Sequence, residues 1–201
     1  MQQIDLPASL PDQPLPADLR GWITESYQRI TTFQDRWDRP QIEQFVASDY
    51  ELVYQLLAWI ERSRLASGRR FIEWGCGFAV VSCLAASLGW DVVGVEAEAD
   101  LIGEARRTVA NWGQPVELVH GNFLPPGGES LADDPTLPSL GHPVESAYEQ
   151  LGMELDDFAI CFAYPWPGEE DFVADVFARF AARDALLALF CGPYDVRLYR
   201  K

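Results

Sequence analysis

The chain has 201 residues, 48% of them hydrophobic, which is enough to bury the core of one globular domain. Its 31 acidic and 15 basic residues give a formal net charge of −16, which makes nucleic acid an unfavourable partner because phosphate backbones are repelled. No apolar run approaches the roughly 18 residues of a membrane span, and residues 1–16 lack the regions of a signal peptide, so a soluble, cytoplasmic protein with no membrane partner is expected.

The first third of the chain predicts a tail followed by helices. Prolines at 7, 11, 14 and 16 indicate an extended or disordered tail over residues 1–16, because each removes a backbone donor and restricts its predecessor. Apolar residues then recur at helical spacing from 17 to 33. A second helical pattern follows Ser48 and Glu51, which have the spacing of a capping box. Residues 17–68 are therefore expected to form a helical cap.

From residue 69 to 201, short apolar runs alternate with helical patterns. The expected strands are 70–74, 91–96, 116–119, 158–163 and 185–191, and the expected helices between them are 79–88, 98–112 and 169–182. Such alternation implies parallel strands joined by right-handed crossovers. The expected fold class is therefore α/β, a three-layer α-β-α sandwich with a mostly parallel sheet. The final "YDVRLYRK" would add an edge strand.

One long connection and four cysteines complete this outline. Residues 124–152 are rich in Pro, Gly and acidic residues, and a connection of this length inside an α/β domain is either a functional lid or a disordered excursion. The sequence leaves both open. The cysteines lie singly in apolar segments, so they are expected to be reduced core thiols and to form neither a disulfide framework nor a metal site: Cys76, Cys83, Cys161 and Cys191.

Candidate functional residues lie where predicted strands end, because ligands of open α/β sheets bind beyond the carboxyl ends of the strands. The segment "EWGCG" places Glu73 just before Gly75 and Gly77. Glycines can take positive φ and carry no Cβ, so a ligand can approach the main chain there. A plain glycine corner, with Glu73 capping nearby amides, would give the same pattern.

The next predicted strand ends on Glu96, 19 residues after Gly77, close to the interval of about 20 residues in nucleoside-binding βαβ units. One carboxylate can accept both hydroxyls of a ribose, so Glu96 with the glycine turn favours a nucleoside over a solvated strand end. Val80 stands where a nicotinamide fingerprint has Gly or Ala, and a carboxylate before the glycines suits an ammonium group better than a pyrophosphate. Both departures favour S-adenosylmethionine.

Together with "HGNF" after the third α/β strand, these motifs resemble those of the class I S-adenosylmethionine-dependent methyltransferases over residues 48–191. The resemblance implies a Rossmann-like methyltransferase fold and S-adenosyl-L-methionine as cofactor, with S-adenosyl-L-homocysteine (SAH) as its product. It also implies a set of cofactor-binding residues along the strand ends: Glu73, Gly75, Cys76, Gly77, Glu96, Ala97, Asn122, Phe123 and Tyr164.

In that resemblance the glycines cradle the methionine moiety, Glu73 faces its ammonium group and Glu96 holds the ribose. Asn122 would accept a hydrogen bond from the adenine amino group, with Ala97 and Phe123 packed on the base. An ordinary Gly-Asn turn is the other interpretation of Asn122 and Phe123, and the neighbouring His120 is expected to be structural.

The segment "FAYPWPGEE" follows the fourth α/β strand. Tyr164 and Trp166 are expected to face the sulfonium, because cations are attracted to ring faces. Tyr164 is also the first candidate to remove a substrate proton, ahead of His142 and Glu169. Glu169 and the two acids after it are otherwise expected to favour the helix dipole. The segment is loosely similar to the Asn/Asp-Pro-Pro-aromatic motif of amino-group methyltransferases, but its first two positions, Ala163 and Tyr164, do not match.

"SDYELVY" and "FAYPWPGEE" resemble still more closely an uncharacterised group of bacterial methyltransferase-like proteins, a likeness that supplies no substrate. The expected function is methyl transfer to an unidentified small-molecule or protein acceptor. The alternative is a non-catalytic sensor or interaction protein that binds S-adenosylmethionine or SAH. A nicotinamide-dependent oxidoreductase is the third hypothesis.

Overall fold

The computed structural model describes residues 1–36, 45–193 and 195–201. A seven-stranded sheet forms its centre, in the order β1-β7-β6-β5-β2-β3-β4. The strands are β1 Gln2–Ile4, β2 Arg70–Trp74, β3 Asp91–Glu96, β4 Val116–His120, β5 Ile160–Ala163, β6 Leu186–Gly192 and β7 Asp195–Arg200. The neighbouring strands β6, β5, β2, β3 and β4 pair in parallel, and β7 runs antiparallel to both its neighbours, β1 and β6. The predicted mostly parallel α/β sheet is confirmed.

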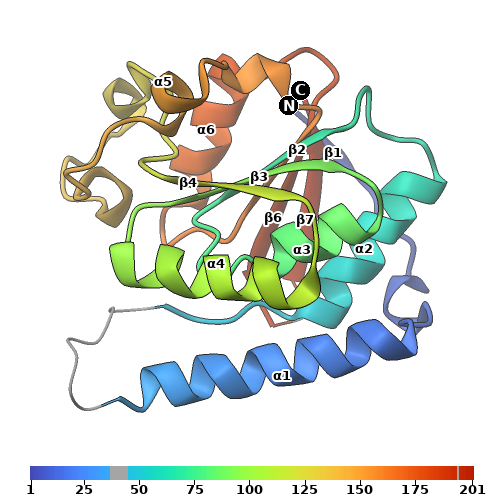
Figure 1. The fold of residues 1–201 in the computed structure, drawn as a ribbon. Coiled ribbons are helices and arrows are strands. Elements are labelled where there is room, and N and C mark those ends of the chain that lie inside the picture. Colours follow the sequence, from blue (N-terminus) through green and yellow to red (C-terminus); the bar gives the residue numbers. More distant parts are fainter. Residues whose placement is uncertain (37–44, 194) are drawn as a thin grey trace.

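Helices cover both faces of this sheet. Their bounds are α1 Ala17–Gln34, α2 Tyr50–Arg62, α3 Val80–Ser87, α4 Ala99–Trp112, α5 Ala147–Leu151 and α6 Glu170–Phe180. Figure 1 shows α2, α3 and α4 on one face with α1 beyond them, and α5 and α6 on the other. Successive side chains of β2 point to opposite faces of the sheet, so they join two different hydrophobic clusters. Phe71 packs with the helices of the first face, whereas Ile72 and Trp74 pack with α6.

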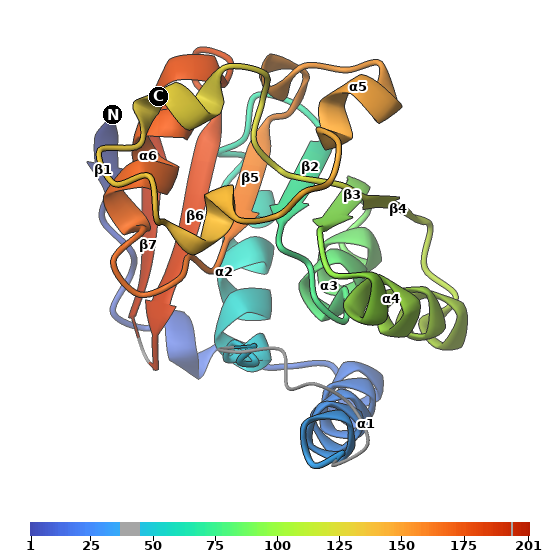
Figure 2. The same cartoon turned by 90° about the vertical axis from the view of Figure 1, so that its left-hand side faces the viewer.

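The N-terminal residues are not a tail, which corrects the prediction from the prolines. Residues 2–4 pair antiparallel with β7, so the two ends of the chain lie side by side (Figure 2). Leu10 is buried, and Gln55 Nε2 donates to the carbonyl oxygens of Pro11 and Gln13 at 2.8 Å each. The prolines all lie after β1, so none of them removes a backbone donor from its pairing with β7. β7 is therefore an inner strand and not the edge strand that was predicted.

The start of α2 also differs from the prediction. The N-cap is Asp49, whose Oδ1 accepts from the Leu52 backbone N–H at 3.0 Å, and not Ser48. Ser48 instead lines the cavity described below. Both are good capping residues one position apart, so the sequence pattern alone does not distinguish them.

All four cysteines are free. Cys76, Cys83 and Cys161 are buried in the core as expected, whereas Cys191 is only partly buried. Across the described ranges, the chain contains no helix that combines the length and the apolar character needed to cross a membrane.

Candidate functional site

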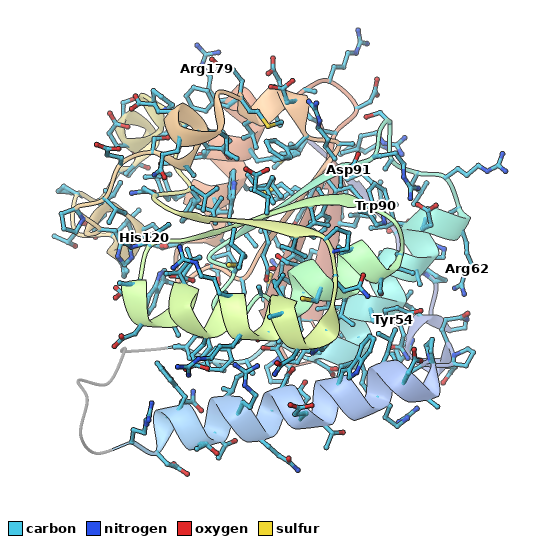
Figure 3. All side chains as sticks on the ribbon, viewed as in Figure 1. Tyr54, Arg62, Trp90, Asp91, His120 and Arg179 are labelled. Atoms are coloured by element: carbon cyan, nitrogen blue, oxygen red, sulfur yellow. The ribbon has the colours of Figure 1, made fainter. Side chains whose placement is uncertain are left out.

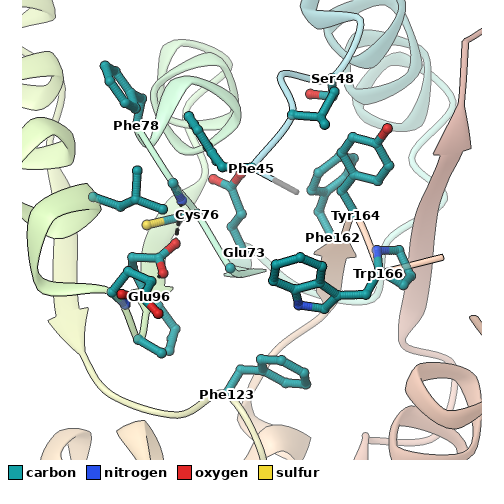
Figure 4. A pocket seen from close by; sticks show the side chains of 18 of the residues that line it. Phe45, Ser48, Glu73, Cys76, Phe78, Glu96, Phe123, Phe162, Tyr164 and Trp166 are labelled. Atoms are coloured by element: carbon teal, nitrogen blue, oxygen red, sulfur yellow. Dashed lines mark hydrogen bonds between the residues drawn. The ribbon is translucent and has the colours of Figure 1, made fainter. Parts of the chain in front are cut away.

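A cavity of about 550 Å³ opens at the carboxyl ends of β2, β3 and β5. Because β3 and β5 flank β2 on opposite sides, the strand order reverses here, which is where open α/β sheets bind ligands. Every residue predicted to bind the cofactor lines this one cavity: Glu73, Gly75, Cys76, Gly77, Glu96, Ala97, Asn122, Phe123 and Tyr164. Figure 4 shows Glu73 near its centre, with Glu96 on one side and Tyr164 on the other.

The turn after β2 favours glycine at two positions. Gly75 and Gly77 have φ of 68° and 52°, a region that side chains with a Cβ rarely adopt. A Cβ on Gly75 would meet no atom within 4 Å, whereas one on Gly77 would lie 2.6 Å from Cε2 of Phe45. The Cys76 N–H donates to the Val95 carbonyl at 2.8 Å, which ties the turn to β3. Bare main chain therefore borders the cavity.

Glu96 is turned toward this glycine turn. Its Oε2 accepts from the Gly77 N–H at 2.7 Å and its Oε1 from the Glu98 N–H at 2.9 Å. Burial raises the pKa of Glu96, whereas these backbone donors lower it. Each carboxylate oxygen has a second acceptor site, so the group can also accept from ligand hydroxyls. The sequence did not reveal that Glu96 also joins two backbone segments.

Glu73 is a buried acid at the centre of the cavity, with 4% of its surface exposed. Its Oε2 accepts from the Ser82 backbone N–H at 2.8 Å and from the Ser82 hydroxyl at 2.5 Å. Burial raises the pKa of Glu73 to about 8, the bonds from Ser82 oppose the rise, and the charge of Glu96 adds to it. The anticipated capping of a nearby amide is thus present, and a cation entering the cavity would stabilise the ionised form of this acid.

Glu73→Gln is expected to change how stability depends on pH. Because the pKa of Glu73 rises from 4.5 to about 8 on folding, the folded chain keeps a proton that the unfolded chain releases between these values. The free energy of unfolding of the wild type should therefore fall relative to the variant as the pH rises through this window, by a few kcal/mol. Urea unfolding of both proteins at about pH 5 and about pH 9 measures this difference, and parallel pH profiles would contradict it.

Asn122 and Phe123 border the cavity from the end of β4. Asn122 Oδ1 accepts from the Leu124 N–H at 2.9 Å, so the alternative interpretation, a local turn, is also present. Phe123 stacks on Trp74, with ring centroids 4.9 Å apart. His120, at the end of β4 (Figure 3), has Nε2 2.9 Å from the Ala97 carbonyl oxygen, a contact in line with a structural role.

Glu169 does not line the cavity, which corrects its place among the candidate bases. It is 1% exposed and accepts from the backbone N–H of Ser139 at 2.9 Å and from the Ser139 hydroxyl. It makes no side-chain cap bond to α6 either. Its bonds hold part of the 124–152 segment, which includes α5 and short 3₁₀ turns. His142 of that segment does line the cavity, with Nδ1 3.4 Å from Glu98 Oε1.

Several lining residues were not predicted as site residues. They come from the segment before α2, from the turn before α3 and from β5: Phe45, Val46, Ser48, Phe78 and Phe162. Phe45 stacks on Phe78 with centroids 5.6 Å apart. No sequence motif marks Phe45, whose place depends on long-range packing. Tyr50, the first residue of α2, also lines the cavity.

The strand order and the glycine turn after β2 define a Rossmann-like methyltransferase fold. The chain resembles an O-methyltransferase from Bacillus cereus in complex with SAH, at 13% identity and a TM-score of 0.52, over 88% of this chain and 66% of that one. It also resembles a methyltransferase from Geobacter sulfurreducens, at 19% identity and a TM-score of 0.51, over 88% and 74%.

A third similar structure is a 16S rRNA methyltransferase from T. thermophilus in complex with AdoMet and guanosine, at 16% identity and a TM-score of 0.51, over 80% of this chain and 45% of that one. At these identities the likeness concerns the fold. The chain spans less than two thirds of the first and third of these proteins. No protein-family profile matches the chain, and no curated protein sequence does so.

Proposed function

We propose that the chain is an S-adenosyl-L-methionine-dependent methyltransferase. The observation that carries this proposal is the convergence of three features on one cavity: the buried acid Glu73, the bare turn at Gly75 and the strand-end acid Glu96. They match three parts of the cofactor: Glu73 the ammonium group, the turn at Gly75 the methionine chain, and Glu96 the ribose. Two similar structures were solved with SAH or AdoMet, which supports the same cofactor here.

The residues present fit such a ligand. Two buried carboxylates with raised pKa, Glu73 and Glu96, would each gain from hydrogen-bond donors, and Gly75 leaves open space where a side chain would stand. We assign the ammonium group to Glu73 and the ribose hydroxyls to Glu96. Phe123, with Ala97 nearby, would pack against the adenine.

S-adenosylmethionine held by Glu73, the turn at Gly75 and Glu96 would supply an electrophilic methyl group, with its thioether as the leaving group. The chain contributes alignment and exclusion of water, which in well-aligned intramolecular reactions is worth about 7–11 kcal/mol. Phe45 and Trp166 enclose the cavity. We assign to Tyr164 the contact with the acceptor and the relay of any acceptor proton toward solvent. Burial, with the nearby charge of Glu73, raises the pKa of Tyr50 well above its ordinary value, so Tyr50 stays a neutral phenol.

The second candidate is a protein that binds S-adenosylmethionine or SAH without transferring the methyl group. It is favoured by one observation: Glu169, an acid of the FAYPWPGEE segment after β5, accepts hydrogen bonds from Ser139 and does not line the cavity. Both candidates share the cofactor site, so binding alone does not separate them.

Calorimetry with SAH and with nicotinamide cofactors is the first test, and only SAH is expected to bind. Incubation with methyl-labelled S-adenosylmethionine and pools of metabolites and proteins is the second, and we expect label in an acceptor. Binding without any transfer would favour the sensor. Binding of a nicotinamide cofactor in place of SAH would contradict both candidates.

A further inference from the structure

The side of the cavity opposite Glu96 is walled by rings. Tyr50 contributes from the start of α2, Phe162 from β5, and Tyr164 and Trp166 from the segment after β5, where Pro165 and Pro167 alternate with them. In Figure 4 the rings of Phe162, Tyr164 and Trp166 lie across Glu73 from Glu96. If the cofactor occupies the Glu96 side, the methyl acceptor must enter between these rings.

This aromatic wall is held in place by its own contacts. The Tyr27 hydroxyl donates to the Ser48 carbonyl at 2.9 Å and accepts from the Tyr50 N–H at 3.1 Å, and the rings of Tyr27 and Tyr50 lie 4.9 Å apart. Tyr164 packs edge-on against Phe190 at 4.8 Å. The prolines fix the backbone φ on either side of Trp166. A wall that is ordered before binding costs little entropy when a flat molecule docks on it.

Carboxylates set the charge that a ligand meets in the cavity. Glu96 and Glu98 line it, within a chain of formal net charge −16. Glu73 joins them as a carboxylate when the ammonium group of the cofactor stabilises its ionised form. An anionic group brought between them would lose its hydration and meet like charges. A cationic group would instead be attracted both to the carboxylates and to the ring faces.

We propose that the acceptor side of this cavity takes a flat, apolar small molecule that carries no anionic group, with Tyr164 and Trp166 against its body. This inference rests on the proposed function, because it takes the Glu96 side to be filled by the cofactor. It narrows the acceptor to neutral or cationic ring compounds and sets aside phosphate-bearing ones.

The test uses three probes with one flat body and different charges: indole, tryptamine and indole-3-acetate. Each is titrated into the full chain saturated with SAH. Indole and tryptamine are expected to bind, and indole-3-acetate at least about tenfold more weakly. Equal binding of all three, preference for the acetate, or no binding of any probe to the SAH complex would overturn the inference.

Two variants locate the binding. Trp166→Ala should weaken indole binding by about tenfold. SAH affinity should fall by less, because SAH lacks the positive sulfonium that ring faces attract, and the remaining SAH binding reports a folded protein. Val46→Lys places a cation at the cavity rim, where Val46 is 57% exposed, and should strengthen indole-3-acetate binding several-fold, whereas the uncharged Val46→Gln should not. Indole binding that is unchanged in Trp166→Ala, or indole-3-acetate binding that is unchanged in Val46→Lys, would place the probe elsewhere and refute the assignment.

The outcomes separate the two proposals. If SAH fails to bind, the proposed function fails at its first step. If SAH binds and the probes do not discriminate by charge, the methyltransferase proposal stands and only the acceptor class is wrong.

Discussion

Glu96→Ala is expected to weaken SAH binding by about a hundredfold or more, measured by calorimetry. The carboxylate is assigned both ribose hydroxyls, and hydrogen bonds to a charged group contribute about 1.5–3 kcal/mol each. Glu117→Ala is the matched control, since Glu117 is an exposed acid on the adjacent strand β4 and does not line the cavity. It should leave SAH affinity unchanged.

The same substitution is also expected to lower stability. Glu96 is 6% exposed and accepts from the N–H groups of Gly77 and Glu98, so it is not an ordinary solvated strand end. Alanine leaves these donors without an acceptor, which costs about 1–3 kcal/mol in the free energy of unfolding. Unaltered SAH affinity in a folded Glu96→Ala protein would remove the ribose assignment.

Gly75→Ala is expected to weaken SAH binding by at least about tenfold, because its methyl group would stand where the ligand approaches the main chain. A Cβ at Gly75 meets no protein atom within 4 Å, so the fold itself accommodates it. The remaining effect on the fold is the strain of a positive φ, about 1–2 kcal/mol in the free energy of unfolding.

Gly152→Ala is the matched control that measures the effect of this backbone strain alone. Gly152 follows α5 with φ of 63°, close to the 68° of Gly75, it also has open space around its Cβ position, and it does not line the cavity. Both variants should lose similar stability in urea unfolding, and only Gly75→Ala should lose affinity. Equal SAH affinities in the two variants would show that no ligand approaches the turn at Gly75.

The sheet and the cofactor-binding side of the cavity could be predicted from short-range patterns in the sequence. The apolar run at 70–74 and the run at 91–96 became β2 and β3 with those bounds, because each is short, rich in β-favouring residues and bounded by turn residues. Parallel strands bring their carboxyl ends to one edge, so residues that follow them, such as Glu73 and Glu96, could be placed together without knowing any contact.

What the sequence could not give depends on long-range contacts. The prolines of the first 16 residues suggested a tail because the open edge of β7, which residues 2–4 cover, lies almost the whole chain away. Phe45 reaches Gly77 only through the packing around α3. Likewise, Glu169 looked like a helix-dipole acid or a base, and its partner Ser139 lies 30 positions earlier in an irregular segment. Short-range patterns carry no information on such pairings.

A crystal structure of the chain with SAH tests the central claim most directly. The proposal predicts the ribose hydroxyls within hydrogen-bond distance of the Glu96 carboxylate, the methionine chain along Gly75 and the ammonium group toward Glu73. SAH bound elsewhere, or in this cavity with its ribose turned away from Glu96, would contradict it.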